Sequence, residues 1–239
     1  MKRLLPLFLL LSGCSSDGDK PVEMAKGPLV PMRVMFWSDA TVSGDGHVAE
    51  RRLADGSRMT REHLVGIDPA VADMPAFWAD VSVETAPDGT VARILILAGI
   101  GVELASAPRR LDLVRSAAGR WSSIRKDGKT TELPELDGCD DAEIAGDHAS
   151  ISLPVRRLAL KAGESKDFDR ALVRLPHLDF EKVRRRLTRV DETTWTWEGL
   201  GKDGTPAWRI DLRADASGTV VEMTGEGLHR KVVRDTAIE

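Results

Sequence analysis

The fold class of this chain is decided by the stretch TTWTWEGLGKDGTPAWRIDLRA, residues 193–214. Apolar and polar side chains alternate in both of its halves, which is the period of a half-buried β-strand. The apolar members of this alternation are Trp195, Trp197, Trp208, Ile210 and Leu212. Between the halves, the tetrapeptide Lys-Asp-Gly-Thr at 202–205 supplies residues that form tight turns. The stretch therefore predicts two strands joined by a hairpin.

The same alternation recurs along the chain after residue 31, with turn-forming residues at short intervals. Asp-Gly and Ser-Gly signals stand at residues 87–90, 126–129 and 216–218. Strands joined by such tight turns pair in an antiparallel way. Further strands are expected at residues 33–37, 81–84, 94–97, 110–113, 153–158, 168–175, 220–223 and 228–233.

We therefore expect a mainly β domain over residues 32–239, with a few short helices. Its architecture is a single curved antiparallel sheet or a half-open β-roll or barrel, and the sequence does not choose between these. No stretch carries a long helical stripe, and short helices are expected only at Asp68–Ala76 and Asp140–Asp147. The sequence also leaves open whether residues 32–110 join the same sheet.

The N-terminus has the order of an export signal. Lys2 and Arg3 precede an apolar run from Leu4 to Leu11, far shorter than the ~20 residues of a membrane-spanning helix. The following Leu-Ser-Gly-Cys resembles the lipobox of bacterial lipoproteins. That resemblance implies that residues 1–13 are a signal peptide, removed before Cys14. The alternative is an ordinary secretory signal with a chance cysteine.

The lipobox resemblance also implies an anchored protein. In lipoproteins the cysteine carries acyl chains (palmitate is a common one), and two or more chains are needed for stable anchoring. Ser15 after Cys14 favours the outer membrane, so we expect a cell-envelope protein that faces the periplasm. Residues 14–31 are rich in Ser, Asp, Gly, Lys and Pro and are expected to be a flexible tether.

Composition excludes several classes of function. The chain has 239 residues and a formal charge of -4, which argues against a general nucleic-acid binder. If Cys14 is lipidated, Cys139 has no partner for a disulfide, so the domain relies on packing alone. Its five histidines are far apart and have no metal-ligand spacing, and no phosphate-binding glycine loop occurs. We therefore expect neither a metal nor a cofactor.

Residues 111–233 resemble the glycolipid-binding family of bacterial proteins. The segments that carry this resemblance are GRW at 119–121, LPELDGCDDAEI at 133–144, SLPVRRLAL at 152–160 and AGES at 162–165. The stretch HASIS at 148–152 departs from the family pattern, which usually has a Thr-Pro-Phe-Thr-Asn type of sequence there. The resemblance implies a fold like that of the lipoprotein-localisation factors, with a large curved sheet half-wrapped around short helices.

The resemblance implies an apolar concave face that holds an amphiphile. Candidates for its wall are the apolar residues expected on inward strand faces: Leu153, Val155, Trp195, Trp197, Trp208 and Ile210. Periodicity does not separate a cavity wall from a filled core. Trp195 and Trp197 suit stacking on a sugar ring at a wet rim, but an ordinary cross-strand aromatic pair has the same pattern.

Arg156 and Arg157 are the charged candidates, expected on opposite faces of a strand. A guanidinium binds the phosphate or carboxylate of a head group in a bidentate way. The alternative is an internal ion pair with Asp137, Asp140 or Glu164. The run Arg184-Arg185-Arg186 is expected as a solvated strand edge, with binding to an anionic membrane surface as the alternative.

The sequence thus supports two main hypotheses of function. The first is a membrane-tethered envelope lipoprotein that binds or carries a glycolipid or another acylated molecule. The second is a non-enzymatic structural or interaction protein of the envelope, with a filled core and a protein partner. An enzyme is not expected, because no catalytic signature surrounds Cys139, which is more simply a buried and inert thiol.

Overall fold

A computed structural model describes residues 30–38, 41–52, 55–66, 77–100, 108–144, 148–225 and 228–233. Cys14 and the tether lie outside these residues. The described strands are β1 (Val30–Ser38), β2 (Thr41–Arg52), β3 (Arg58–Gly66), β4 (Phe77–Thr85), β5 (Val91–Ile100), β6 (Arg109–Arg115), β7 (Trp121–Ile124), β8 (Thr130–Glu132), β9 (Asp141–Ile144), β10 (Ser165–Arg174), β11 (Asp179–Arg189), β12 (Thr194–Leu200), β13 (Pro206–Ala214), β14 (Val220–Gly225) and β15 (Leu228–Val233). A 3-10 turn, η1, covers Pro134–Leu136, and the helix α1 covers His148–Leu158.

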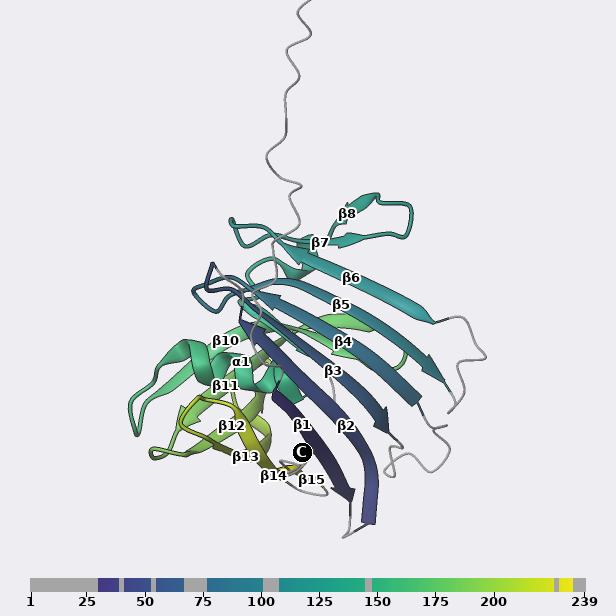
Figure 1. The fold of residues 1–239 in the computed structure, drawn as a ribbon. Coiled ribbons are helices and arrows are strands. Elements are labelled where there is room, and N and C mark those ends of the chain that lie inside the picture. The colour runs from purple at the N-terminus through teal and green to yellow at the C-terminus, as the bar shows by residue number, and fades with distance from the viewer. Residues whose placement is uncertain are drawn as a thin grey trace, which may run out of the picture.

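The described strands form one sheet in the order β8-β7-β6-β5-β4-β3-β2-β1-β15-β14-β13-β12-β11-β10-β9. Strands β1 to β8 are an antiparallel meander, strands β10 to β15 are a second, and β1 pairs with β15 to join them. Only β9 is parallel to its neighbour among these strands. The sheet curls so that its C-terminal strands turn back under the N-terminal ones (Figure 1). The prediction of a mainly β, curved and half-open sheet is confirmed, and residues 32–110 contribute strands to the same sheet.

The hairpin predicted at 193–214 is present as β12 and β13, with Trp195 paired to Leu212 and Trp197 to Ile210. Its turn places Gly204 at a φ of 81°, a conformation that glycine adopts without steric cost. Short turns of the same kind join most of the consecutive strands on either side, which is why two long meanders form.

The helix α1 occupies the segment where the sequence predicts a strand, residues 153–158, and that prediction is wrong. Ile151, Val155 and Leu158 recur at intervals of four and three residues, so they share one face of a helix. All three contribute to one apolar cluster. The local run Leu153-Pro154-Val155 fits a strand equally well, and tertiary packing decides between the two.

A proline lies within α1, and a distant arginine compensates for it. Pro154 has no amide hydrogen to donate to the carbonyl of Ser150, one turn earlier. The Nη2 of Arg170, on β10, donates to that carbonyl at 2.8 Å. The hydrogen bond that proline removes from the helix is therefore replaced from the sheet.

Strand β9 corrects a second expectation. Residues Asp141–Ile144 form a strand and not part of the helix predicted at Asp140–Asp147. All four residues are buried, with Ala142 and Ile144 in the first apolar cluster. The acidic residues alternate with these two and point to the other side of the strand. The other predicted helix, Asp68–Ala76, lies outside the described residues.

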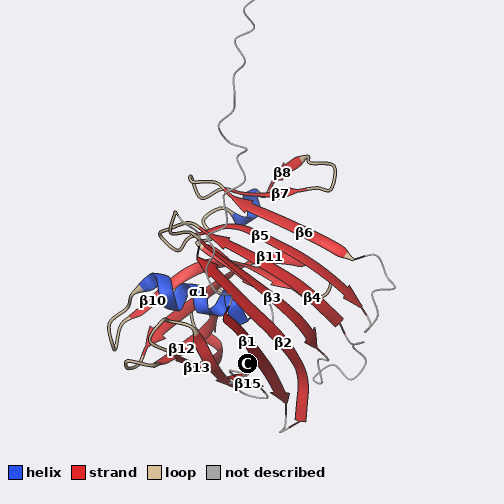
Figure 2. Cartoon of the chain, in the orientation of Figure 1, coloured by secondary structure: helices blue, strands red, loops and turns tan. Residues whose placement is uncertain are grey.

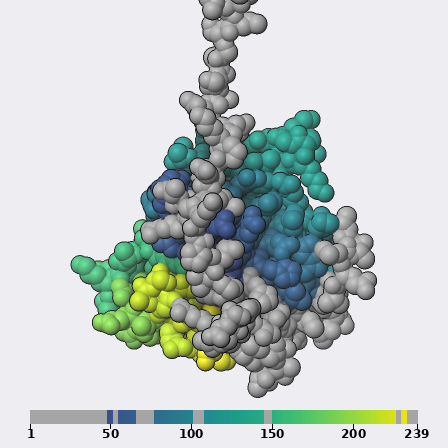
Figure 3. Space-filling model, viewed as in Figure 1, coloured from purple at the N-terminus to yellow at the C-terminus, as the bar shows by residue number. Residues whose placement is uncertain are grey.

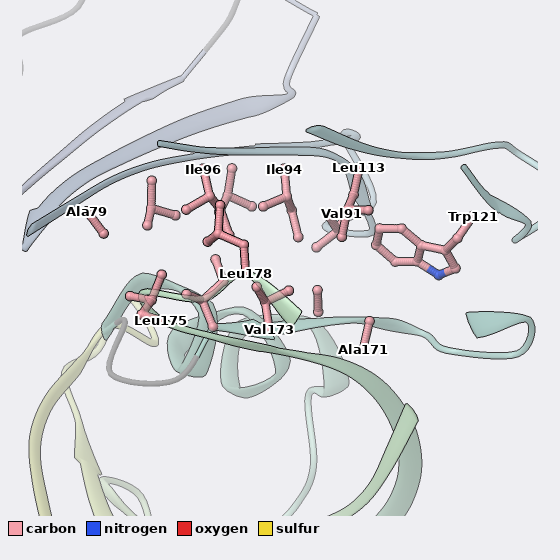
Figure 4. Packing of buried hydrophobic residues seen from close by; sticks show 14 of the residues in the cluster. Ala79, Val91, Ile94, Ile96, Leu113, Trp121, Ala171, Val173, Leu175 and Leu178 are labelled. Carbon is pink, nitrogen blue, oxygen red and sulfur yellow. The ribbon is translucent and has the colours of Figure 1, made fainter. Parts of the chain in front are cut away.

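The first apolar cluster packs the N-terminal strands against β10. Ile94, Ile96 and Leu113 point down from β5 and β6, and Ala171 and Val173 point up from β10 (Figure 4). Each of these five side chains is fully buried. Full burial of a side chain such as Ile or Leu contributes about 1.5–3 kcal/mol, so this layer supplies a large part of the stability.

The second apolar cluster lies on the other side of β10, where β10 to β14 curve around α1. Ile151 and Val155 of the helix pack with Phe168, Trp197 and Leu212 of the strands. The helix is drawn within the curl of these strands in Figure 2. In the space-filling view the C-terminal strands, coloured green to yellow, gather at one end of the molecule (Figure 3).

The two ends of the sheet approach each other near β9. The indole Nε1 of Trp121, on β7, donates to the carbonyl oxygen of Cys139 at 3.2 Å. The Nε of Arg115, on β6, donates to the same oxygen at 3.3 Å. Side chains therefore bridge the first meander to the chain that enters β9, and the curl is a half-open barrel rather than a flat sheet. None of the described helices is long and apolar enough to cross a bilayer.

Candidate binding site

The predicted apolar wall residues divide between the two clusters. Leu153 lies in the first cluster and Val155 in the second, both on α1 and less than a tenth exposed. Trp195 and Trp197 are buried in the second cluster, and the Trp197 ring meets Phe168 edge-on at 5.7 Å between centroids. These indoles lie in the core rather than at a rim. Around α1, the described apolar residues pack against one another as a core.

Trp208 and Ile210 are in a different environment. Ile210 is half-buried at the border of the second cluster, and Trp208 is 39% exposed. The Trp208 ring lies against Gly199 on β12, where a methyl group added to the glycine would stand only 2.3 Å from the ring. The guanidinium of Arg185, on β11, lies 4.8 Å from the ring centroid. Trp208 is therefore an exposed aromatic surface held between a glycine and an arginine.

Arg156 and Arg157 both form ion pairs, as one of the two interpretations predicted. The partners differ from the predicted Asp137, Asp140 and Glu164, because the two arginines lie on a helix and not on a strand. Arg156 bonds Glu50 on β2 and the hydroxyl of Thr219, each at 2.5 Å. Arg157 reaches Asp141 on β9 at 3.4 Å.

Asp141 and Glu143 belong to a row of buried charged side chains that crosses the inside of the curled sheet. We call Arg157, Asp141, Arg170, Glu143 and Arg185 the charged ladder. Arg170 is fully buried, and its Nε donates to Asp141 while its Nη1 lies 3.7 Å from Glu143. Arg185 binds Glu143 through two bonds, of 2.7 and 3.2 Å. Positive and negative groups thus alternate from α1 to Trp208.

The alternation of positive and negative charges along the ladder has an energetic reason. A charge buried without a partner costs several kcal/mol, whereas an alternating row supplies each charge with an opposite neighbour. Two indoles also face the ladder, since the Arg170 guanidinium lies 5.1 Å from the Trp197 ring. Arg185 has the corresponding position over Trp208. The apolar cluster and the exposed indole are therefore connected through charged side chains.

The run Arg184-Arg185-Arg186 is only partly the solvated edge that the sequence predicts. Arg184 and Arg186 face outward and pair with Asp167, but Arg185 points inward and is buried. Strand β11 is not an edge, because it pairs with β10 on one side and β12 on the other. The two-residue period of a strand gives neighbouring arginines these opposite environments.

Cys139 is enclosed in the first apolar cluster. Burial raises the pKa of its thiol to about 12, against a smaller opposing effect of Lys182. The group is thus a neutral thiol at pH 7 and a poor nucleophile. The described residues contain no group of three or more His, Cys, Asp or Glu side chains arranged for a metal ion.

The central residues of the ladder were not predicted from the sequence. Arg170 interrupts an apolar alternation between Phe168 and Leu172, and an arginine at an inward position signals a buried ion pair. Asp141 and Glu143 flank Ala142 in the same way. These signals were present, but the partners lie on separate strands whose pairing the sequence did not predict.

Comparisons with known proteins agree with this architecture. A family model described as "Putative glycolipid-binding" matches residues 35–226. A DUF1089 family protein from Pseudomonas aeruginosa is similar in structure, with a TM-score of 0.62 and 23% identity over 79% of this chain and 92% of that one. A β-barrel-like DUF1849 protein from Brucella abortus has a TM-score of 0.52 and 15% identity over 86% and 97% of the two chains. No curated protein matches the sequence.

Proposed function

Because this chain belongs to the glycolipid-binding family, we propose that it is an envelope lipoprotein whose β domain binds a glycolipid or a similar amphiphile. Family membership supports a binding function in general. The place of binding, the class of ligand and the membrane tether are our proposal. The site is the end of the curl where Trp208 is exposed beside Arg185 and Glu143.

The exposed indole of Trp208 is the observation that carries the proposal. Tryptophan joins an apolar face to a hydrogen-bond donor, which suits the stacking of a sugar ring at a wet surface. Gly199 and Arg185 hold the ring in place before any ligand arrives. A preorganised surface loses little entropy on binding. The charged groups of the ladder next to it supply hydrogen bonds for hydroxyl or ionic groups.

The packing around α1 limits where an acyl chain lies. Ile151, Val155 and Trp197 fill the region between helix and strands, so the tail has its contacts at the open end, near the half-buried Leu172 and Ile210. A deep apolar cavity would gain about 0.8 kcal/mol per methylene. A shallow site gains this free energy only for the first few methylene groups of the acyl chain.

Native mass spectrometry of the protein from its own host tests the proposal directly. We expect an added mass that fragments as an amphiphile, lost in Trp208→Ala and retained in the control Arg209→Ala. The control residue is adjacent on β13 but pairs with Asp211 on the opposite face. An added mass that persists in Trp208→Ala would place the ligand elsewhere. No added mass in the wild-type protein would refute the binding proposal.

The membrane tether has a separate test. We propose that Cys14 is acylated and holds the domain at the periplasmic face of the outer membrane. Radiolabelled palmitate is expected to enter the wild-type protein and not Cys14→Ser, and only the wild type should sediment with outer membranes. Labelling of Cys14→Ser would refute lipidation at this residue.

The filled packing around α1 favours a second candidate, a non-enzymatic interaction protein of the envelope. Its binding surface would then meet a protein partner instead of an amphiphile. Crosslinking in intact cells from a photoreactive residue in place of the exposed Pro206, two positions before Trp208 on β13, distinguishes the two and keeps the indole. A discrete protein adduct supports the interaction protein, and a lipid adduct supports the first proposal.

A further inference from the structure

The donors of the charged ladder specify the ligand further. We infer that the head group of the amphiphile is anionic and that it binds Arg170 and Arg185 in competition with Glu143. This inference rests on the proposed binding function. It adds the charge of the ligand and the residues that recognise that charge.

Both arginines around Glu143 have an Nη1 without a short hydrogen bond, although the Nη1 of Arg170 lies 3.7 Å from the Glu143 carboxylate. The Nε and Nη2 of Arg185 donate hydrogen bonds to Glu143, and its Nη1 has only a long 3.4 Å bond to the carbonyl of Arg184. The Nε of Arg170 donates to Asp141, and its Nη2 donates to the carbonyl oxygens of Ala142 and Ser150. Its Nη1 is buried and has no hydrogen-bond partner among the described residues. Buried donors are nearly always paired, so an acceptor is expected here.

A second buried donor lies beside Arg170. The indole Nε1 of Trp197 also lacks a partner among the described residues, although the side chain is fully buried. The Arg170 guanidinium lies 5.1 Å from the centre of that ring. Two buried donors without hydrogen bonds, on side chains that are in contact, favour a ligand rich in acceptor oxygens. Carboxylate, phosphate and sulfate groups have this chemistry and match the guanidinium fork.

The charges at this end of the ladder also favour an anion. Glu143 is the single carboxylate of the ladder that lies between Arg170 and Arg185, whereas Asp141 lies between Arg170 and Arg157. Further negative charge lies at the other end, where Asp140 acts on Asp141 and Asp88 on Arg157. The surplus positive charge is therefore next to Trp208 and not next to α1.

Exposure sets the order in which a ligand meets these groups. The side chains of Arg185 and Glu143 are 7% and 10% exposed, and that of Arg170 is 0% exposed. An anion that arrives along the Trp208 ring contacts Arg185 first. It reaches the Nη1 of Arg170 only when the Glu143 carboxylate moves aside. Glu143 is therefore a competitor that occupies the site until an anion replaces it.

The test compares two probes that differ by one carboxylate, octyl β-D-glucuronide and octyl β-D-glucopyranoside. Calorimetric titration uses the full chain with Cys14→Ser, below the micellar concentration of each probe. We expect the glucuronide to bind on the order of tenfold more tightly, because it gains a charge-assisted bond. In Arg185→Gln this preference should disappear. Arg186→Gln is the matched control, as its side chain faces outward on the same strand and binds Asp167.

Glu143→Gln provides an independent arm, since Arg185→Gln leaves a buried carboxylate and can impair folding. Glutamine keeps the shape and an acceptor oxygen but removes the competing charge. The affinity for the glucuronide should rise roughly tenfold while that for the glucoside stays within about twofold. Circular dichroism and urea unfolding confirm that each variant is folded.

The outcomes separate the inference from the proposed function. Equal affinity for both probes, with both sensitive to Trp208→Ala, would refute the anionic head group and leave amphiphile binding intact; water then satisfies the free donors. Failure of both probes to bind would reject the proposed function as well. Inorganic phosphate that binds as tightly as the glucuronide would show a site for a free anion, which contradicts a lipid head group.

Discussion

Two glycines lie under tryptophan rings, and together they allow a quantitative prediction. A methyl group added at Gly99 would stand 2.4 Å from the Nε1 of Trp78, and one added at Gly199 would stand 2.3 Å from the Nε1 of Trp208. Ordinary contacts begin near 3.4 Å, so in both Gly99→Ala and Gly199→Ala the ring must move by about an ångström or more. The initial clash is thus nearly the same at the two sites.

The loss of stability differs because only one of the two rings is exposed enough to move into solvent. Trp208 is 39% exposed and swings into solvent, losing about three-fifths of the roughly 1.5–3 kcal/mol that full burial contributes. Gly199→Ala should therefore lower the free energy of unfolding by about 1–2 kcal/mol. Trp78 is only 7% exposed, so overpacking adds about 1–3 kcal/mol to the lost contacts. Gly99→Ala should cost about 3 kcal/mol or more.

Urea unfolding followed by circular dichroism measures both values, with Glu198→Ala on the same strand as a control for β12. Gly199→Ala should also weaken binding of octyl glucoside, because the Trp208 ring leaves its position between Gly199 and Arg185. An equal loss of unfolding free energy in the two alanine variants would refute the argument that the exposed Trp208 ring relieves its clash by moving into solvent. So would a Gly199→Ala protein as stable as the wild type.

Three more predictions concern buried polar groups. Arg170→Met should destabilise the fold by about 3–5 kcal/mol in urea unfolding, because it leaves Asp141 without its main partner, and Arg170→Met/Asp141→Leu should recover part of the loss. Burial alone would raise the pKa of Asp112, but hydrogen bonds from Arg93 and Arg110 outweigh it and hold the pKa below the ordinary 3.8. This part of the stability is present above that value and is lost as pH falls through the lowered pKa, so unfolding free energies measured from pH 6 to 2 should fall less steeply in Asp112→Asn. The Cys139 thiol, with a pKa of about 12, should react with Ellman's reagent at least a hundredfold more slowly in the folded than in the urea-unfolded protein; similar rates would contradict its burial.

Strand periodicity predicted much of this fold because the strands are long and their turns are tight. Val81 and Val83 are buried while Ser82 and Glu84 are half-buried, as a period of two requires. The pattern also has an exception in Asp112, which takes an outward position but is buried under Arg93 and Arg110. Alternation predicts the side of the sheet that a residue faces, but it does not predict what covers that side.

The helix α1 and the charged ladder could not be predicted in the same way. The run Leu153-Pro154-Val155 is compatible with a strand, and in the helix that forms instead the carbonyl of Ser150 is bonded by Arg170, 20 positions along the chain. Long-range partners of this kind are determined by the pairing of β9 with β10, a parallel contact that no local turn signals. The same pairing places Glu143 where Arg185 reaches it.

The two halves of the curl interior contribute differently to stability and to binding. An apolar interior of the same volume would be as stable as the ladder or more stable, by about 1–4 kcal/mol, because buried ion pairs rarely recover the cost of their desolvation. The apolar cluster around α1 is therefore the main source of stability in this part of the fold, and the structural role of the ladder is to bond the carbonyls of Ala142 and Ser150 through Arg170. The groups that folding does not explain are the Nη1 of Arg170, which has no hydrogen bond among the described residues, the Arg185–Glu143 pair and the exposed face of Trp208. The Arg185–Glu143 pair and Trp208 lie at the end of the ladder nearest to solvent, with the Nη1 of Arg170 behind Glu143, so the ligand that we propose would enter from that end.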